Sequence, residues 1–324
     1  MKILINRQPL RDQSWGGGNN FVIACYDHLP KFGYTPVTSL QDQPDVILMI
    51  DPRPDGISPS INEIAYYKSV MKERVAVVHR INECDARKGT NDVDDLLLKC
   101  QRYVDERVFV SQWLSEHLRG RWANMHPSGA YAAQSIYGGV SNDPVIYNGV
   151  DTDLFHPEPV TGDKIKIVTH HWSAHALKGA DVTRWLDEYF IPKHGDRYEY
   201  TYIGRLGFQL KNSLMIPACH GKALASVLAP NHIYVSGSRW DPGPNHCLEA
   251  MACGLEIFVH ADGGGAVEFA GKESSYSSLE ELEKMLLGWN GQNPRPYPAG
   301  VVRPWHECVR QYATLFDELT SHMP

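Results

Sequence analysis

The sequence predicts an α/β protein with two Rossmann-like domains, each built on a doubly wound parallel sheet. Short runs rich in Val and Ile alternate with segments long enough to form crossover helices. Within these runs apolar and polar residues do not alternate, which is typical of strands buried on both faces. A chain of 324 residues is also long enough for roughly two domains.

The predicted strands fall into two groups along the chain. The first group is expected at Lys2–Asn6, Val46–Ile50, Val75–Val78, Val108–Val110 and Val145–Tyr147. The second group is expected at Ile165–Thr169, Tyr200–Ile203, His232–Val235 and Glu256–His260. A segment with two prolines, at 151–159, separates the groups and marks a boundary. We therefore predict one domain over residues 1–157 and a second over residues 158–304.

The C-terminal part predicts a linker followed by a helix. Residues 290–304 are dense in Pro and Gly, which indicates an extended linker. From Trp305 to Leu319 the apolar residues recur at helical spacing, which predicts an amphipathic helix. The residues of this apolar stripe are Cys308, Tyr312, Leu315, Phe316 and Leu319.

Composition excludes several classes of protein. Hydrophobic residues make up 43%, charged residues 21%, and the mean hydropathy is -0.35, which is typical of a soluble globular protein. No apolar run approaches the length of a membrane-spanning helix, and the N-terminal run is too short for a signal peptide. The net charge of -7 argues against a nucleic-acid partner. The seven cysteines form no C-x-x-C pair, so we expect reduced thiols in a cytoplasmic protein.

A glycine-rich loop follows the first predicted strand. It contains Gly16, Gly17 and Gly18 and precedes a predicted helix. Glycines allow close approach of the backbone to a ligand, and a helix N-terminus offers unpaired N–H groups suited to a phosphate. The loop lacks the G-x-G-x-x-G dinucleotide fingerprint, because Phe21 stands at the last glycine position. A structural turn and a ligand loop therefore both remain open.

A second motif spans residues 239–254 and places two carboxylates at a junction between a loop and a helix. Pro244 is suited to the first turn of a helix and Gly254 to its end. Asp241 then lies in the loop before the helix, and Glu249 lies within it. Two carboxylates at this spacing can converge on a polyol and accept strong hydrogen bonds from its hydroxyls. Spacing alone leaves open a solvated Glu and an Asp that favours the helix dipole.

This second motif resembles the E-x7-E signature of retaining GT-B glycosyltransferases of family 4. Further segments resemble that family in the same order along the chain: 145–155 (an interdomain V-I-x-N-G-V-D segment), 177–179 (Leu-Lys-Gly), 262–268 (a Gly-rich loop ending in Glu) and the 15–19 loop. The resemblance implies a GT-B fold, with two domains facing across a cleft. It also implies that the C-terminal helix, 305–324, crosses back and completes the N-terminal domain.

The resemblance implies roles for residues of the second domain. Glu249 would hold the ribose of a nucleoside-diphosphate sugar, and Lys178 would neutralise the diphosphate. Asp241, where the family has Glu, would contact the transferred sugar; because its side chain is shorter, it would reach a different hydroxyl or act through water. The family's phosphate-binding Arg is missing. The donor-binding candidates that remain are Ser173, Arg205, Asn245 and the three glycines Gly16, Gly17 and Gly18, with Arg239 as a further basic candidate.

The first domain would supply the acceptor side and one catalytic histidine. The family has a His at the end of a strand near the sugar, and His79 matches it; from the residues alone, a satisfied interior histidine is the other interpretation. The acceptor-binding candidates are Trp15, Asn19, Arg80 and Arg87.

The resemblance implies transfer of a sugar, with retention and without a metal, from a nucleotide sugar to a hydroxyl of a glycan or lipid-linked glycan. We expect a cytoplasmic protein, with a membrane surface as a further partner. A zinc site at His170, His171 and His175 is disfavoured because the segment lacks H-E-x-x-H. Three alternatives stay open: a non-catalytic nucleotide-sugar binding protein, a GT-B sugar-nucleotide epimerase, and a nicotinamide-dependent dehydrogenase. No G-x-S-x-G elbow supports a serine hydrolase.

Overall fold

The computed structural model describes residues 1–11, 16–71, 74–125, 143–291 and 297–321, and it divides into two compact units. The first unit comprises Met1–Arg11, Gly17–Asn148 and the C-terminal segment from Trp305. The second unit comprises Gly149–Pro304 and, from the N-terminal part of the chain, Gly16. The chain passes from the first unit to the second at Asn148 and Gly149, before the predicted boundary between residues 157 and 158.

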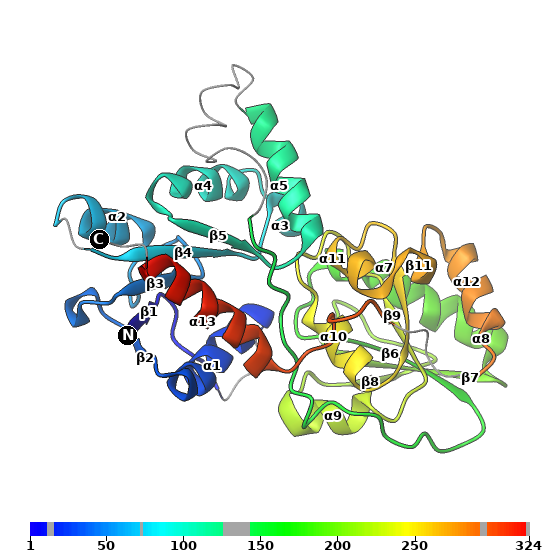
Figure 1. The fold of residues 1–324 in the computed structure, drawn as a ribbon. Coiled ribbons are helices and arrows are strands. Elements are labelled where there is room, and N and C mark those ends of the chain that lie inside the picture. Colours follow the sequence, from blue (N-terminus) through cyan, green and yellow to red (C-terminus); the bar gives the residue numbers. More distant parts are fainter. Residues whose placement is uncertain (12–15, 72–73, 126–142, 292–296, 322–324) are drawn as a thin grey trace. The chain divides into compact units, whose positions relative to one another are not determined.

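The first unit is built on a five-stranded parallel sheet (Figure 1). Its strands are β1 (Lys2–Ile5), β2 (Thr35–Val37), β3 (Val46–Met49), β4 (Ala76–Ile81) and β5 (Glu106–Phe109). They are arranged in the order β2-β1-β3-β4-β5. The chain winds outward from β1 in one direction and then from β3 in the other. The strand order therefore reverses between β1 and β3, where ligands bind in many open α/β sheets.

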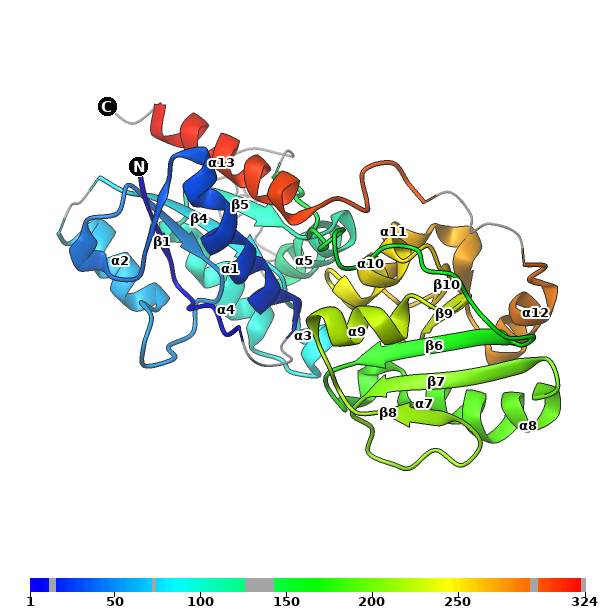
Figure 2. The ribbon, with the colours of Figure 1, turned by 90° about the horizontal axis from the view of Figure 1, so that it is seen from below.

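Helices cover both faces of this sheet. The helices are α1 (Gly17–His28), α2 (Ile61–Ser69), α3 (Asp85–Lys88), α4 (Val93–Cys100), α5 (Gln112–Met125) and α13 (Trp305–Ser321), with short turns η1 (Leu29–Phe32), η2 (Leu40–Asp42) and η3 (Gln101–Tyr103). Helices α1 and α13 run side by side on one face (Figure 2). Helices α2 and α4 pack on the other face.

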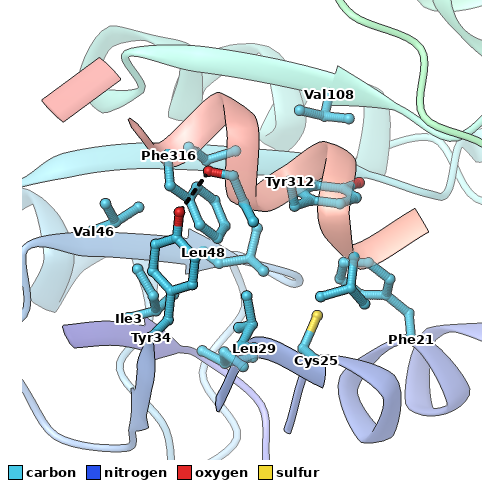
Figure 3. Close-up of a cluster of buried hydrophobic side chains, with 14 of the residues drawn as sticks. Ile3, Phe21, Cys25, Leu29, Tyr34, Val46, Leu48, Val108, Tyr312 and Phe316 are labelled. Atoms are coloured by element: carbon cyan, nitrogen blue, oxygen red, sulfur yellow. Dashed lines mark hydrogen bonds between the residues drawn. The ribbon is translucent and has the colours of Figure 1, made fainter. Parts of the chain in front are cut away.

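The C-terminal helix α13 is part of the core of the first unit (Figure 3). Its residues Tyr312 and Phe316 are fully buried against α1 and the strands. The hydroxyl of Tyr34 donates a hydrogen bond of 2.9 Å to the carbonyl of Ala313. The structure thus confirms the amphipathic helix and its return to the N-terminal part of the chain.

The second unit is built on a six-stranded parallel sheet. Its strands are β6 (Ile165–His171), β7 (Tyr198–Gly204), β8 (Leu214–Ile216), β9 (Ile233–Ser236), β10 (Glu256–His260) and β11 (Ser275–Tyr276), in the order β11-β10-β9-β6-β7-β8. The order reverses between β6 and β9, where Ile167 is opposite Ile233. This is the switch point of the second sheet.

One face of the second sheet packs on a long interrupted helix and on α12. The helices of this unit are α7 (Ala180–Trp185), α8 (Ile191–His194), α9 (Gly221–Leu228), α10 (Asn245–Ala252), α11 (Gly265–Ala270) and α12 (Leu279–Gly288), with turns η4 (Ala176–Lys178), η5 (Leu186–Phe190) and η6 (Lys272–Ser274). A π-helical turn at η5 joins α7 to α8. Buried tyrosines of β7 pack against α7, α8 and α12.

Differences from the predicted strands have local causes. Strand β4 continues to Ile81, beyond the predicted end at Val78. Val145 forms only an isolated bridge to Phe109 instead of a strand. The strands β2, β8 and β11 were not predicted, because each has only two or three residues. Short edge strands carry too little of the apolar pattern to be recognised.

Two expectations from composition concern the cysteines, expected as reduced thiols, and the helices, none of which was expected to span a membrane. All seven cysteines are thiols in the structure, and six of them are buried. Among the residues described, no helix has the length and apolar character needed to cross a bilayer.

Candidate functional site

Most of the predicted donor-site residues lie in the second unit, at the carboxyl edge of its sheet. The loop after β6 carries Lys178, and the loop after β9 carries Asp241. Glu249 lies in α10, the helix that follows β9. Because β6 and β9 flank the switch point, their ends are where an open α/β sheet accommodates a ligand.

Asp241 forms an ion pair with Lys178. Its Oδ2 atom lies 2.8 Å from Lys178 Nζ and 3.2 Å from Ser238 Oγ. The same oxygen lies 3.5 Å from His246 Nε2. Asp241 is only 6% exposed. The attraction between opposite charges is stronger where they are shielded from water, and these three groups hold the carboxylate in a defined position.

Glu249 is held by a histidine from the neighbouring strand. Its Oε2 atom lies 2.8 Å from Nε2 of His170, which is near the end of β6. This contact uses Oε2, and within the described part of the chain Oε1 can accept hydrogen bonds from a ligand. Asp241 and Glu249 thus each pair with a basic side chain from β6 or the loop after it: Lys178 and His170.

Buried imidazoles lie next to these carboxylates. The ring of His171 meets the ring of His246 edge-on, with the centroids 4.6 Å apart. The hydroxyl of Tyr234 lies 3.2 Å from His246 Nδ1. Burial lowers the pKa of His246 to about 4 and holds the pKa of His171 well below its usual range. Both rings are therefore neutral at pH 7.

The backbone around Asp241 is tightly constrained. Trp240 has φ 49, a conformation that costs energy for a bulky residue. Its amide donates to the carbonyl of Asp262 at 2.7 Å, and the Gly265 amide donates to the carbonyl of Asp241 at 2.8 Å. These bonds fasten the Asp241 loop to the Gly-rich loop after β10 and compensate the strain.

A close approach of two glycines shapes the neighbouring loop. Gly179 has φ +83, and a Cβ atom there would lie 2.5 Å from backbone atoms of Gly237. Only glycine fits at such a contact. The Lys178 loop and the loop after β9 are consequently in direct backbone contact, which fixes where the Lys178 side chain starts.

The remaining donor-site candidates lie around the same edge. Asn245 is the first residue of α10. Ser173 Oγ accepts a bond of 3.3 Å from the His175 amide. Arg205 follows β7 directly and is exposed, and its amide donates to the His171 carbonyl at 3.2 Å. Arg239 instead forms a two-pronged ion pair with Asp181, at 3.0 and 2.6 Å.

Two candidates of the first unit are buried within it. His79 lies inside β4 with no exposed surface, and its Nδ1 accepts a bond of 3.0 Å from Gln101. Burial lowers its pKa to about 3, so the ring is neutral. Arg80 is 1% exposed; it lies 4.2 Å from the ring centroid of Phe21 and donates to Asn148 at 2.7 Å. Because β4 extends past both residues, burial argues against the predicted sugar and acceptor contacts.

The other candidates from the N-terminal half of the chain flank α1 and α3. Gly17 and Gly18 are the first two residues of α1, and Gly16 precedes it. The Asn19 side chain bonds to both the amide and the carbonyl of Leu10, at 2.9 and 2.8 Å, and so closes a loop. Arg87 lies in α3 and is 8% exposed. Trp15 lies outside the described residues.

The switch point of the first unit carries a different set of groups. The buried side chain of Asn6 donates to the carbonyl of Asp51 at 2.7 Å and accepts from the Ile50 amide at 2.6 Å. Arg53 lies beside it and pairs with Asp51 at 2.8 Å and also with Glu83. This ion-pair network is partly open to solvent, since the Arg53 side chain is 42% exposed.

Four residues of the second unit were not predicted to act at the site: His170, Tyr234, Ser238 and His246. The sequence contains an indication of a polar role for two of them. His170 comes at the end of a buried strand, and His246 lies between the two carboxylates of the motif. Tyr234 lies inside a strand that shows only apolar character, so nothing in its neighbourhood indicates a polar role.

The described part of the chain contains no group of three or more His, Cys, Asp or Glu side chains placed to hold a metal. The histidines weighed as zinc ligands have other contacts. His170 bonds to Glu249, and His175 accepts a bond of 3.3 Å from the Leu177 amide.

Comparisons with known proteins place the fold. No protein-family model matches the chain, and neither does any curated protein. Among solved structures, the chain is similar to a sucrose-phosphate synthase from Thermosynechococcus elongatus, with a TM-score of 0.65 and 13% identity over 99% of both chains.

Two further structures are similar over most of the chain. WaaG, a glycosyltransferase involved in lipopolysaccharide biosynthesis, has a TM-score of 0.56 and 11% identity, with 100% of this chain and 99% of that chain covered. The catalytic domain of starch synthase IV from Arabidopsis thaliana, bound to ADP and acarbose, has a TM-score of 0.53 and 12% identity, with 96% and 80% covered. The chain therefore has the GT-B fold.

Proposed function

We propose that the protein is a glycosyltransferase that moves a sugar from a nucleoside-diphosphate sugar to an acceptor hydroxyl. The observation that carries this proposal is the paired arrangement at the second switch point. There Asp241 lies 2.8 Å from Lys178, and Glu249 lies 2.8 Å from His170. The GT-B fold supports the proposal, since the similar structures include glycosyltransferases and one that is bound to ADP.

The second unit would bind the donor. Glu249 Oε1 would accept hydrogen bonds from the ribose hydroxyls, while His170 keeps the other oxygen in place. Asp241 would contact the transferred sugar. Hydrogen bonds between a hydroxyl and a desolvated carboxylate contribute about 1.5–3 kcal/mol each. Asn245 and Ser173 would bind the phosphates from the start of α10 and from the loop after β6.

Charge on the departing diphosphate would be stabilised by cationic side chains. Lys178 is the cation at the centre of the site, and its side chain is 17% exposed, so it can meet a ligand. Arg205 is exposed at the end of the neighbouring strand β7 and would replace the family's missing arginine. Fixed positive groups aimed at developing charge lower a barrier without reorganisation. We propose that these side chains, and not a metal ion, perform this task; activity should then persist in EDTA.

The acceptor would bind on the first unit, and we propose a carbohydrate or lipid-linked carbohydrate. With Arg80 buried, the polar groups exposed at that sheet edge include those of Arg53, Arg7 and Asp51. Guanidinium and carboxylate groups both bind sugar hydroxyls well. Arg53→Ala should therefore raise the KM for the acceptor and leave hydrolysis of the donor unchanged. We further propose a cytoplasmic location, consistent with thiols at all seven cysteines.

The test is incubation with UDP-, GDP- and ADP-hexoses, with and without oligosaccharide acceptors, followed by NMR of the products. Transfer that retains the anomeric configuration and is lost in Asp241→Asn is expected. An inverted product would contradict the proposed retention. A product formed from the donor alone with a changed sugar would indicate an epimerase, and binding without turnover would indicate a non-catalytic protein.

A further inference from the structure

One oxygen of Asp241 is shared by three donors, and the proposed reaction changes the role of one of them. Lys178 Nζ lies 2.8 Å from Oδ2, so its charge is largely neutralised by Asp241. A diphosphate carries more charge than a single carboxylate and would attract the same ammonium. When Lys178 turns towards the diphosphate, Asp241 must be kept in place by its two remaining neighbours, Ser238 and His246.

His246 is in position to do this because its ring is fixed on several sides. The Tyr234 hydroxyl lies 3.2 Å from Nδ1, and Cys247 Sγ lies 3.4 Å from the same atom. The His171 ring packs edge-on against it at 4.6 Å. His246 is 7% exposed, so solvent does not compete for either nitrogen.

The Tyr234 hydroxyl has two acceptors for its one hydrogen, the His170 carbonyl and Nδ1 of His246, each 3.2 Å away. The Asp241 carboxylate can only accept, so the neutral imidazole that binds it carries its hydrogen on Nε2. This N–H faces Asp241 Oδ2 at 3.5 Å, the outer limit of a hydrogen bond. In the described structure Nε2 is buried and makes no shorter bond. A buried donor without a good acceptor is costly, so a closer approach to Asp241 would be favourable.

We infer that His246 is a positioning residue, whose Nε2–H holds the Asp241 carboxylate against the transferred sugar when Lys178 turns to the diphosphate. The inference rests on the proposed function. The groups that face His246 are Asp241, Lys178, His170, His171, Tyr234 and Cys247. Because burial lowers the pKa of His246 to about 4, the ring donates this bond as a neutral group.

The test compares His246→Leu with His246→Gln, whose amide can place an N–H near the position of Nε2. The donor is whichever UDP-, GDP- or ADP-hexose the wild-type protein turns over, and binding of the matching diphosphate alone is measured separately. We expect His246→Leu to lower kcat by about 10- to 100-fold, the loss of one bond to a charged group. We expect His246→Gln to recover most of that loss. The Kd of the diphosphate should stay within about twofold in both variants, since Glu249 is untouched.

His156, whose side chain is 50% exposed in the same unit, provides matched controls as His156→Leu and His156→Gln. Should His246→Leu fail to fold, His246→Asn replaces it, because its shorter amide can reach the position of Nδ1 but not that of Nε2; the same fall in kcat is expected. Histidine nitrogen NMR on the wild-type protein adds a readout that does not depend on activity, with the hydrogen of His246 expected on Nε2.

Two results would overturn the inference while the proposed function stands: kcat within twofold of wild type in His246→Leu, or the hydrogen of His246 found on Nδ1. If His246→Gln is as impaired as His246→Leu, the donor role is also wrong. Failure of the proposed function has a different signature, because the wild-type protein would then neither bind nor convert any member of the panel. That result would overturn both the inference and the proposed function on which it rests.

Discussion

The two sheets reverse their strand order in the same way, but the groups at the two switch points differ. In the second unit the loops after β6 and β9 hold largely shielded charges: 17% of the Lys178 side chain and 9% of the Asp241 side chain are exposed. In the first unit the corresponding place is occupied by Asn6, whose amide is engaged by the main chain. The charges nearby are partly solvated, as in the pair between Arg53 and Asp51.

The difference shows how two similar folds can serve different tasks. Buried charges with fixed partners give strong, directional fields, as needed at a reacting centre. Half-exposed ion pairs contribute little stability, but their side chains can rearrange around varied ligands. The second unit therefore has a preorganised set of charges, and the first has a well-packed framework with an adaptable polar edge. The predictions below test this contrast.

The largest expected effect is on the framework of the first unit. Phe316→Ala removes a fully buried ring of α13 from the core around Phe21 and Tyr312. Truncation of such a ring costs about 3–5 kcal/mol in the free energy of unfolding. Hydrogen exchange should show faster opening of β1, β3 and α1, with the second unit protected as before. Glu318→Ala, an exposed change in the same helix, is the control. An equal increase in hydrogen exchange in both units would contradict the contrast between them.

The next effect falls on the site of the second unit. Lys178→Ala should lower kcat by about 10²–10³, since removal of one preorganised donor costs about 2.7–4 kcal/mol at the transition state. Ser238 and His246 still contact Asp241 in this variant, so the protein should fold. Steady-state kinetics measure the effect, with Lys222→Ala on the surface of α9 as control. Near-full activity of a folded Lys178→Ala protein would refute the role of Lys178.

A third prediction concerns acid stability. His79 in the first unit and His246 in the second have pKa values lowered to about 3 and about 4 from an ordinary value of 6.5. Below pH 6.5 the unfolded chain binds more protons than the folded one, so stability falls as the pH drops towards 4. Each histidine adds a slope of up to about 1.4 kcal/mol per pH unit.

Urea unfolding between pH 6.5 and 4.5 tests this prediction. His79→Gln should lower the slope of the unfolding free energy against pH by up to about 1.4 kcal/mol per pH unit, the contribution of one proton. His156→Gln, at an exposed site, should leave the slope unchanged. An identical slope in His79→Gln and wild type would show that the buried ring does not resist protonation.

The smallest effect is expected at the polar edge of the first unit. Arg53→Ala breaks pairs with Asp51 and Glu83, but its side chain is 42% exposed. Exposed pairs contribute about 0–1 kcal/mol, so the free energy of unfolding should change by no more than that. Chemical denaturation measures it. A loss of several kcal/mol would mean that the two switch points are energetically alike.

Much of the fold could be predicted from the sequence because its signals are local. Runs such as Val46–Ile50 and Glu256–His260 show their burial in their own composition, and the stripe on α13 shows one apolar face. The course of β4 could not be predicted in this way. His79 and Arg80 look like polar residues after a strand, yet they are buried by Gln101, Phe21 and Asn148, which are distant in sequence.

Prediction of the candidate site from local sequence has the same limit. Asp241 and Glu249 were predicted because both lie in one short motif. Their basic partners Lys178 and His170 come from β6 and the loop after it, so these pairs depend on the sheet order and not on spacing. His246 lies within the motif, but its ring contacts Tyr234 of β9 and is packed by His171 of β6. Such contacts become visible only once β6 and β9 are known to be neighbours.

The most direct test of the central claim is nucleotide binding, measured by thermal unfolding in the presence of UDP, GDP, ADP, CMP and their sugar conjugates. A ligand at 100 times its Kd adds about 2.7 kcal/mol of stability. We predict selective stabilisation by one diphosphate, lost in Glu249→Ala and retained in Glu158→Ala, an exposed carboxylate of the same unit. No stabilisation by any of them, or equal stabilisation of the Glu249→Ala protein, would contradict a donor site at the second switch point.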